Sequence, residues 1–208
     1  MRKNKKQRIR EKRERIKNKE LCKKYPWLVP KYGWPAKPPN DYDYSWIMWY
    51  GWPYGWNKAF GDIYLKELGD AVDRAGYKDI FTIEEMKEKY GRCILYCSPV
   101  NNEIDEITAK YETLSENICQ ICGKPDVPIL YDGYWIYTWC YDCFRKHHKN
   151  WIGVKEETEI RRTYKERCKD DGKMADYIEW KINGNVVKKD ISVTANKIRA
   201  RWRKMTIK

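Results

Sequence analysis

The sequence predicts an α+β fold, in which a small aromatic-rich domain precedes a cysteine-containing module and a C-terminal β-hairpin plus helix. Three observations lead to this prediction. Residues 25–56 combine many Tyr and Trp residues with six prolines and three glycines, a composition that excludes a long helix or a central strand. Two Cys-x-x-Cys pairs lie between residues 119 and 143. Ile178, Trp180 and Ile182 alternate before Asn183-Gly184, a dipeptide typical of two-residue hairpin turns, and Val186-Val187 begin the return strand.

Charge is concentrated at the two ends of the chain. Residues 1–24 contain 13 Lys or Arg against 3 Glu, and residues 188–208 contain 8 against one Asp. The two ends therefore carry net charges of +10 and +7, and because the net charge of the whole chain is +13, the segment between them has a net charge of −4. Basic ends suit a polyanion, since each cation that neutralises a phosphate releases counterions. The alternative is that the charged ends only keep an aromatic-rich body in solution.

Composition also bears on location. The first 20 residues are charged throughout and lack the apolar core of a signal peptide. No stretch approaches the roughly 20 apolar residues of a membrane span. Eight cysteines without an export signal favour reduced thiols and zinc over disulfides. We therefore predict a cytoplasmic location and no membrane partner.

The arm at residues 1–24 is predicted to be helical or disordered, because residues 2–24 contain neither Pro nor Gly. Ile9, Ile16 and Leu21 are too few for a continuous apolar stripe, so we expect the arm to become ordered only on a partner. Its candidate phosphate contacts are Lys5, Lys6, Arg8, Arg10, Lys12 and Arg13.

The aromatic residues of the 25–116 domain allow two interpretations. They could present a stacking surface for bases, or they could form the core of a domain with few aliphatic residues, which we favour because Trp side chains are usually buried. Further along, a helix is predicted from an Asn57 cap to Gly76. Thr82-x-x-Glu85 predicts a second, short helix that ends at Gly91. A buried strand over 92–97 and a helix over 104–114 complete the domain.

The module at 117–150 is predicted to bind one structural zinc ion. Cys119-x-x-Cys122 and Cys140-x-x-Cys143 are separated by 17 residues, and two tight turns can direct four thiolates at one ion about 2.3 Å from each sulfur. A knuckle, a hairpin with Tyr131-Asp-Gly-Tyr as its turn, and a second pair at a helix start describe a treble clef or zinc ribbon. His147, four residues after Cys143, is a rival fourth ligand.

Other cysteines and the histidines do not predict a second site. Cys93 and Cys97 share a strand face but stand about 13 Å apart at ~3.3 Å per residue, so they are predicted to be core thiols, like Cys22 and Cys168. His147 and His148 are the only histidines, and no Asp-His pair typical of an HNH-like nuclease accompanies them. We therefore rank a metal-dependent, HNH-like nuclease below nucleic-acid binding and protein interaction as a hypothesis for the function.

The C-terminal segment, 151–208, is predicted to contain a helix over 155–171, a hairpin over 177–189 and a basic helix. Ser192 or Thr194 is expected to cap the last helix, with Ile198, Trp202 and Met205 on its buried face. Its candidate phosphate contacts are Arg199, Arg201 and Arg203.

Several segments resemble a family of uncharacterised bacteriophage and bacterial proteins. They are Cys22-Lys-Lys-Tyr-Pro-Trp-Leu-Val-Pro, Asp41-Tyr-Asp-Tyr-Ser-Trp, Gly55-Trp-Asn-Lys-Ala-Phe-Gly, Lys87-Glu-Lys-Tyr-Gly, Lys110-Tyr-Glu-Thr-Leu-Ser-Glu and Cys119-x-x-Cys122-Gly-Lys-Pro. The resemblance covers roughly residues 20–145 and implies no particular activity; for a phage product the location would be the host cytoplasm. The spacing of the four cysteines is also similar to that of GATA-type fingers, over about 35 residues and in the metal frame only.

Together these observations predict a non-enzymatic, phage-type zinc protein that binds DNA or RNA mainly through phosphate contacts. The alternative is a protein-interaction module that binds or inhibits a host enzyme, a defence complex or a ribonucleoprotein.

Overall fold

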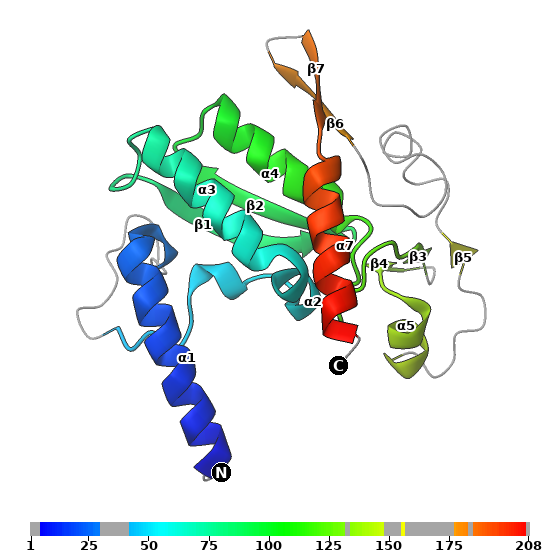
Figure 1. Cartoon of the computed structure of the whole chain (residues 1–208), viewed down its shortest axis with the longest axis horizontal. Coiled ribbons are helices and arrows are strands. Elements are labelled where there is room, and N and C mark those ends of the chain that lie inside the picture. Colours follow the sequence, from blue (N-terminus) through cyan, green and yellow to red (C-terminus); the bar gives the residue numbers. More distant parts are fainter. Residues whose placement is uncertain are drawn as a thin grey trace.

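Helices and strands are mixed along the chain in the computed structural model (Figure 1), in agreement with the predicted α+β class. The structure describes residues 5–29, 42–131, 134–147, 155–156, 177–182 and 185–206. Among these residues, no helix combines the length and the apolar character that crossing a bilayer requires.

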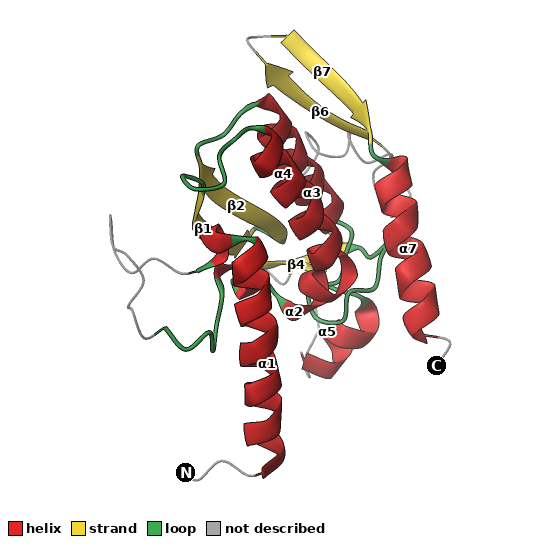
Figure 2. Ribbon diagram, turned by 60° about the vertical axis from the view of Figure 1, so that its left-hand side comes forward, coloured by secondary structure: helices red, strands yellow, loops and turns green. Residues whose placement is uncertain are grey.

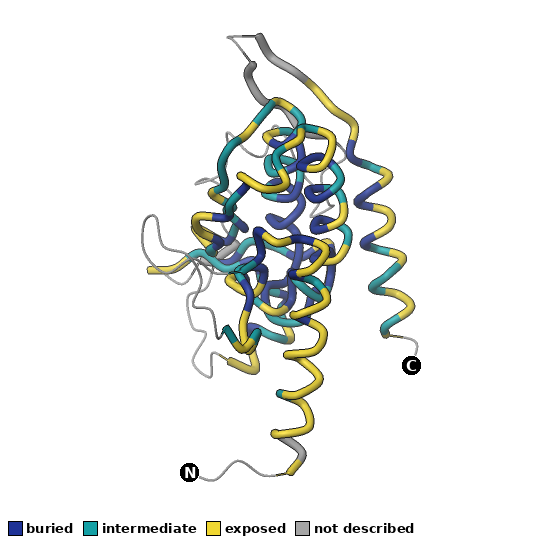
Figure 3. The backbone as a smooth tube through the Cα atoms, turned by 90° about the vertical axis from the view of Figure 1, so that its left-hand side faces the viewer, coloured by how far each residue is buried: buried dark blue, intermediate teal, exposed yellow. Residues whose placement is uncertain are grey.

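The basic arm forms a helix, α1 (Lys5–Lys24), followed by the short 3-10 helix η1 (Pro26–Leu28). Its first turns extend away from the rest of the molecule and are exposed (Figure 3). Its last two turns pack into the core, where Asn18 and Cys22 are buried, as is Tyr25 directly after the helix. The expectation that the arm needs a partner to become ordered is therefore wrong for these turns, because Asn18, Leu21, Cys22 and Tyr25 have the spacing of one helix face.

The aromatic segment supplies core residues, as predicted. Trp27, Trp49, Trp52 and Trp56 are each at most 4% exposed. The segment contains a 3-10 helix, η2 (Met48–Tyr50), and enters a continuous helical stretch made of α2 (Tyr54–Trp56), the π-helical η3 (Asn57–Gly61) and α3 (Asp62–Arg74).

The predicted start of this helix is wrong. The stretch begins at Tyr54, and Asn57 lies inside it, where its Nδ2 donates to the carbonyl oxygen of Trp52 over 3.3 Å. The predicted end is confirmed, since Gly76 follows the last turn with a φ of +70°.

Residues 82–89 form a strand, β1 (Thr82–Lys89), which corrects the short helix predicted there. β1 pairs with β2 (Arg92–Ser98) through a tight turn in which Tyr90 and Gly91 have φ values of 52° and 72°. The register shifts between Ile83 and Glu85, which marks a β-bulge. The bulge lets Ile83 and Met86, three residues apart, both be buried, and this produces the helix-like spacing in the sequence.

Helix α4 (Asn102–Ser115) confirms the helix predicted over 104–114. The Asn101 side chain caps it by accepting from the amide of Ile104 over 2.9 Å. Helices α3 and α4 lie side by side over the β1–β2 hairpin (Figures 1 and 2). Tyr64 of α3 stacks on Tyr111 of α4 with ring centroids 4.1 Å apart. β2 follows the predicted 92–97 strand, although only Cys93 in it is fully buried.

The C-terminal hairpin is confirmed as β6 (Tyr177–Ile182) and β7 (Asn185–Asp190), followed by α7 (Ser192–Thr206). Neither Ser192 nor Thr194 precedes the helix; instead the Asp190 carboxylate accepts from the Ser192 amide over 2.8 Å. Of the helix predicted over 155–171, residues 157–171 lie outside the described part. Lys155–Glu156 form a short strand, β5, instead of a helix.

One hydrophobic core joins these elements. It contains residues from α1 to α4 together with Ile191, Ala195 and Ile198, which bring α7 onto the body. A second, small cluster surrounds Cys119, Val127 and Cys140.

Candidate metal centre

The four cysteines predicted to bind metal meet at one point. Cys119 and Cys122 lie on the turn after α4, and Cys140 and Cys143 flank the start of α5 (Tyr141–His147). All four sulfur atoms lie within 4.8 Å of one another. A regular tetrahedron with zinc–sulfur distances of about 2.3 Å has edges of about 3.8 Å. The Sγ atoms of Cys122 and Cys140 are 3.8 Å apart, so the arrangement fits one zinc-sized ion.

Backbone hydrogen bonds shape the first cysteine turn. The amide of Gly123 donates to the carbonyl oxygen of Cys119 over 2.9 Å, and the Cys119 amide donates to the carbonyl oxygen of Lys124 over 2.8 Å. Gly123 has a φ of +80°, a conformation that a residue with a Cβ rarely adopts. This is why the sequence places Gly directly after the second cysteine.

Antiparallel strands return the chain to the second cysteine turn. β3 (Ile129–Tyr131) pairs with β4 (Ile136–Thr138), and β5 adds to the other edge of β3. Helix α5 then begins, with the Phe144 amide donating to the carbonyl oxygen of Cys140 over 2.9 Å. The predicted Tyr131–Tyr134 turn includes residues 132 and 133, which lie outside the described part.

Three of the four thiols have shifted pKa values. A hydrogen bond from Cys122, together with backbone amides, lowers the pKa of Cys119 to about 5. The same hydrogen bond to Cys119, with burial, raises the pKa of Cys122. Burial and the hydrogen bond with Cys140 raise the pKa of Cys143 to about 12. Cys119 therefore ionises readily, whereas hydrogen bonding and burial keep Cys122 and Cys143 protonated. A bound divalent ion favours the thiolate form of its ligands.

His147 does not compete for the fourth position. It is exposed, its ring lies edge-on against Trp139 with centroids 5.6 Å apart, and it is not part of the cysteine group. Cys143 therefore completes the set, as predicted. His148 lies outside the described residues.

The metal centre is attached to the aromatic body by contacts that sequence reasoning missed. The Gly55 amide donates to the carbonyl oxygen of Gln120 over 2.8 Å, and the Trp56 indole N–H donates to that of Ile118 over 2.9 Å. Thr138 of β4 donates through its hydroxyl to the carbonyl oxygen of Gly91 over 2.9 Å. A glycine between two aromatic residues inside a helix is the one signal that could have indicated close packing at Gly55.

The predicted phosphate contacts on α1 are exposed: the described side chains are those of Lys5, Arg8, Arg10, Lys12 and Arg13, and Lys6 also belongs to the helix. The arginines of α7 differ from one another. Arg199 holds the Asp126 carboxylate with nitrogen–oxygen distances of 3.1–3.2 Å, and Arg201 pairs with Asp62 at 3.1 Å. Arg203 is exposed. Arg199 and Arg201 thus both pair with carboxylates outside α7, which was not foreseen.

The other predicted thiols are not brought to the metal centre. Cys22 and Cys93 are buried and Cys97 is half-buried, each without a disulfide, and Cys168 lies outside the described part. Comparison of the chain with family models, curated proteins and solved structures gave no match. The resemblance to phage proteins therefore stays a prediction that rests on short motifs.

Proposed function

We propose that the protein binds nucleic acid, either DNA or RNA, through phosphate contacts made by α1, and that it does so without catalysing a reaction. The observation that carries this proposal is the projection of a cationic helix from a body into which its C-terminal turns pack (Figure 1). Closely spaced like charges destabilise a helix. An anionic partner removes this repulsion and gains from counterion release.

The cations of α1 follow two rows at helical spacing. One row contains Lys5, Arg8, Lys12, Arg15 and Lys19, and the other contains Lys6, Arg10, Arg13 and Lys17. In the first row Arg15 is paired with Asp43 at 3.2 Å, and in the second Arg10 approaches Glu14 at 3.8 Å. Such exposed pairs are weak, so most of the cations remain available for phosphates. On α7, Arg203 is the better candidate, because Arg199 and Arg201 already hold carboxylates.

In this proposal the metal centre has a structural role. A cysteine turn, the β3–β4 pair and a second cysteine pair at the start of α5 support a treble-clef arrangement. Four protein ligands leave no open position for a water or a substrate, which supports structural zinc.

The test is fluorescence anisotropy with duplex DNA, single-stranded DNA and structured RNA across a salt series. A triple variant, Arg8→Gln, Lys12→Gln and Arg13→Gln, is compared with a control of equal charge change, Lys66→Gln, Lys78→Gln and Lys89→Gln, whose lysines are exposed outside α1. The α1 variant should bind more weakly, with a log–log salt slope smaller by about 0.7–0.9 for each phosphate that the substitutions leave without its cation. Equal binding by both variants would contradict the proposal.

A protein-interaction module is the second candidate, and one observation favours it. Tyr134 and Trp135 are 89% and 69% exposed beside the β3–β4 pair, and aromatic side chains are frequent binding hot spots. A host enzyme, a defence complex or a ribonucleoprotein would be the partner. Capture of one defined partner that survives nuclease treatment and is abolished in Trp135→Ser would support this candidate.

A further inference from the structure

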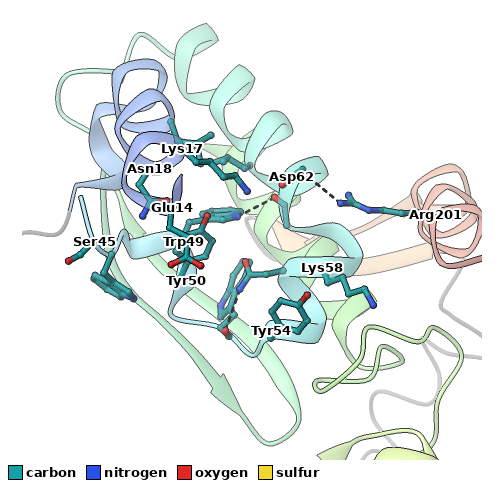
Figure 4. Close-up of a pocket in the computed structure, with 16 residues that line it drawn as sticks. Glu14, Lys17, Asn18, Ser45, Trp49, Tyr50, Tyr54, Lys58, Asp62 and Arg201 are labelled. Atoms are coloured by element: carbon teal, nitrogen blue, oxygen red, sulfur yellow. Dashed lines mark hydrogen bonds and ion pairs between the residues drawn. The ribbon is translucent and has the colours of Figure 1, made fainter. Parts of the chain in front are cut away.

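A cavity of about 590 Å³ lies between α1, the aromatic segment, the start of α3 and Arg201 of α7 (Figure 4). Its volume is in the range of small-molecule and cofactor sites, roughly 300–1,000 Å³. The cavity thus lies where the projecting basic helix joins the body, and it receives side chains from both basic ends of the chain.

One wall of the cavity presents aromatic rings to solvent. Trp46, Tyr50 and Tyr54 are 41%, 36% and 73% exposed, whereas Trp49 and Trp52, which also line the cavity, are buried in the core. Most described rings of this segment contribute to the core, so three exposed rings around one cavity are a local exception. An exposed ring face is a platform on which a planar base can stack.

Two of the side chains that line the cavity, Asn18 and Asn57, have an amide oxygen without a hydrogen-bond partner among the described residues. Asn18 is 1% exposed, and its Nδ2 donates to the carbonyl oxygen of Tyr44 over 2.8 Å, while its Oδ1 accepts no hydrogen bond within the described part of the chain. Asn57 is half-buried, and its Oδ1 likewise has no partner among the described residues. Buried amide oxygens are normally satisfied, so each oxygen gains a partner if its side chain turns toward a ligand with N–H donors in the cavity.

Charged groups surround the opening with both signs. Lys17, Lys58 and Arg201 face Glu14 and Asp62, and Arg201 holds Asp62 at 3.1 Å. Lys17 is the last member of one basic row of α1, the row that contains Arg10 and Arg13. A phosphate chain that follows this row along the helix therefore arrives at the cavity.

We propose that the cavity binds an unpaired nucleotide of a single-stranded nucleic acid, an inference that rests on the proposed function of α1. The base stacks on the exposed rings, its amino or imino N–H groups satisfy the buried asparagine oxygens, and its phosphate lies at Lys17. Bases in a duplex have neither their faces nor their Watson–Crick edges free, so the site selects single strands.

The test compares a single-stranded oligonucleotide with the duplex of the same sequence. The variant is Trp46→Ala with Tyr54→Ala, and the control is Tyr90→Asn with Tyr96→Ala, which removes two exposed rings from the β1–β2 hairpin. Because stacking contributes about 1–3 kcal/mol per base, the cavity variant should bind the single strand roughly ten-fold or more weakly. Its affinity for the duplex and its salt slope should stay unchanged, and the control should bind both as the wild type does.

The possible failures are distinguishable. No binding of any nucleic acid by the wild type would contradict the proposed function itself. Undiminished single-strand binding by the cavity variant, or an equal loss for both forms, would overturn the cavity inference alone. Saturable quenching of Trp fluorescence by a free mononucleotide without oligonucleotide binding would assign the site to free nucleotides and overturn the strand-bound version. If the variant loses a protein partner while its nucleic-acid binding is unchanged, the exposed rings form the binding site of that protein. This result would also overturn the cavity inference.

Discussion

The backbone of Gly55 lies against the backbone of Gln120: the Gly55 amide donates to the Gln120 carbonyl oxygen over 2.8 Å. A Cβ at Gly55 would stand 2.2 Å from the carbonyl oxygen of Cys119 and 2.6 Å from that of Gln120. Gly123 lies close on the other side, since its Cβ would stand 2.7 Å from the Gly55 carbonyl oxygen. At this point the turn that carries Cys119 and Cys122 packs backbone to backbone on the start of α2.

We expect Gly55→Ala to destabilise the protein by about 1–3 kcal/mol, because the obstructing atoms are backbone and move only with the cysteine turn. The Gly55→Ala protein should also lose zinc to a chelator more readily than the wild type does. Gly61→Ala is the matched control on the same helical stretch, since its nearest neighbour is a side-chain oxygen 3.2 Å away. Urea unfolding measures both variants. A Gly55→Ala protein as stable as the wild type would show that the close approach does not constrain the centre.

Zinc binding is the second prediction. The purified protein should contain one zinc ion per chain, and Cys140→Ser should lose it, because Cys140 is buried among the four sulfurs. Structural zinc contributes roughly 10–16 kcal/mol in isolated zinc-finger peptides. We therefore expect the cluster around Cys119 and Val127 to unfold in the variant. Elemental analysis measures the zinc content, and amide hydrogen exchange measures the unfolding of this cluster. Cys97→Ser, which lies away from the site, is the control. Equal zinc in both variants would contradict the ligand set.

The clustering of the four cysteines could be predicted from the sequence, because residue type and local spacing determine it almost alone. The attachment of this cluster to the body could not, since Gly55 and Gln120 are far apart along the chain and nothing in either segment indicates that they touch. The cavity could not be predicted for the same reason, because the segments that line it meet only in the folded chain. Its lining includes Lys17, Trp46, Tyr54 and Arg201.

The local errors have local physical causes. At β1, the bulge between Ile83 and Glu85 gives a strand the apolar spacing of a helix. At α1, counting aliphatic residues missed the buried face, because Asn18, Cys22 and Tyr25 supply most of it. Asn18 can be buried because its side chain donates to the carbonyl oxygen of Tyr44. That partner lies far along the sequence, so the burial of Asn18 could not be predicted from the helix alone.

The attachment of α1 gives a third prediction. Deleting residues 1–16 should change stability by no more than about 0.5 kcal/mol, because the removed side chains are mostly exposed. Deleting residues 1–24 should destabilise by roughly 2–5 kcal/mol, since it also removes the buried side chains of Asn18 and Cys22. Urea unfolding of the two truncated proteins distinguishes these outcomes. Similar stabilities would show that the last two turns of α1 do not contribute to the core.

Cys22 gives a prediction about pH. Burial raises the pKa of its thiol from the ordinary value of 9.0 to about 11. The folded state therefore holds the proton more tightly than the unfolded state does, and the resulting stability is complete below pH 9 and is lost as pH rises toward 11. This rise in the pKa corresponds to about 2–3 kcal/mol of unfolding free energy.

Cys22→Ala removes this titration, so the stability difference between wild type and variant should shrink by about 2 kcal/mol between pH 9 and pH 11. Taking the difference cancels the Tyr and Lys groups that titrate in the same range. Leu21→Ala is the control, because it trims the neighbouring position of α1 without removing a titrating group, and its difference from the wild type should stay constant. Urea unfolding at several pH values measures all three proteins. A constant difference for Cys22→Ala as well would mean that the thiol ionises as easily in the folded protein as in the unfolded chain.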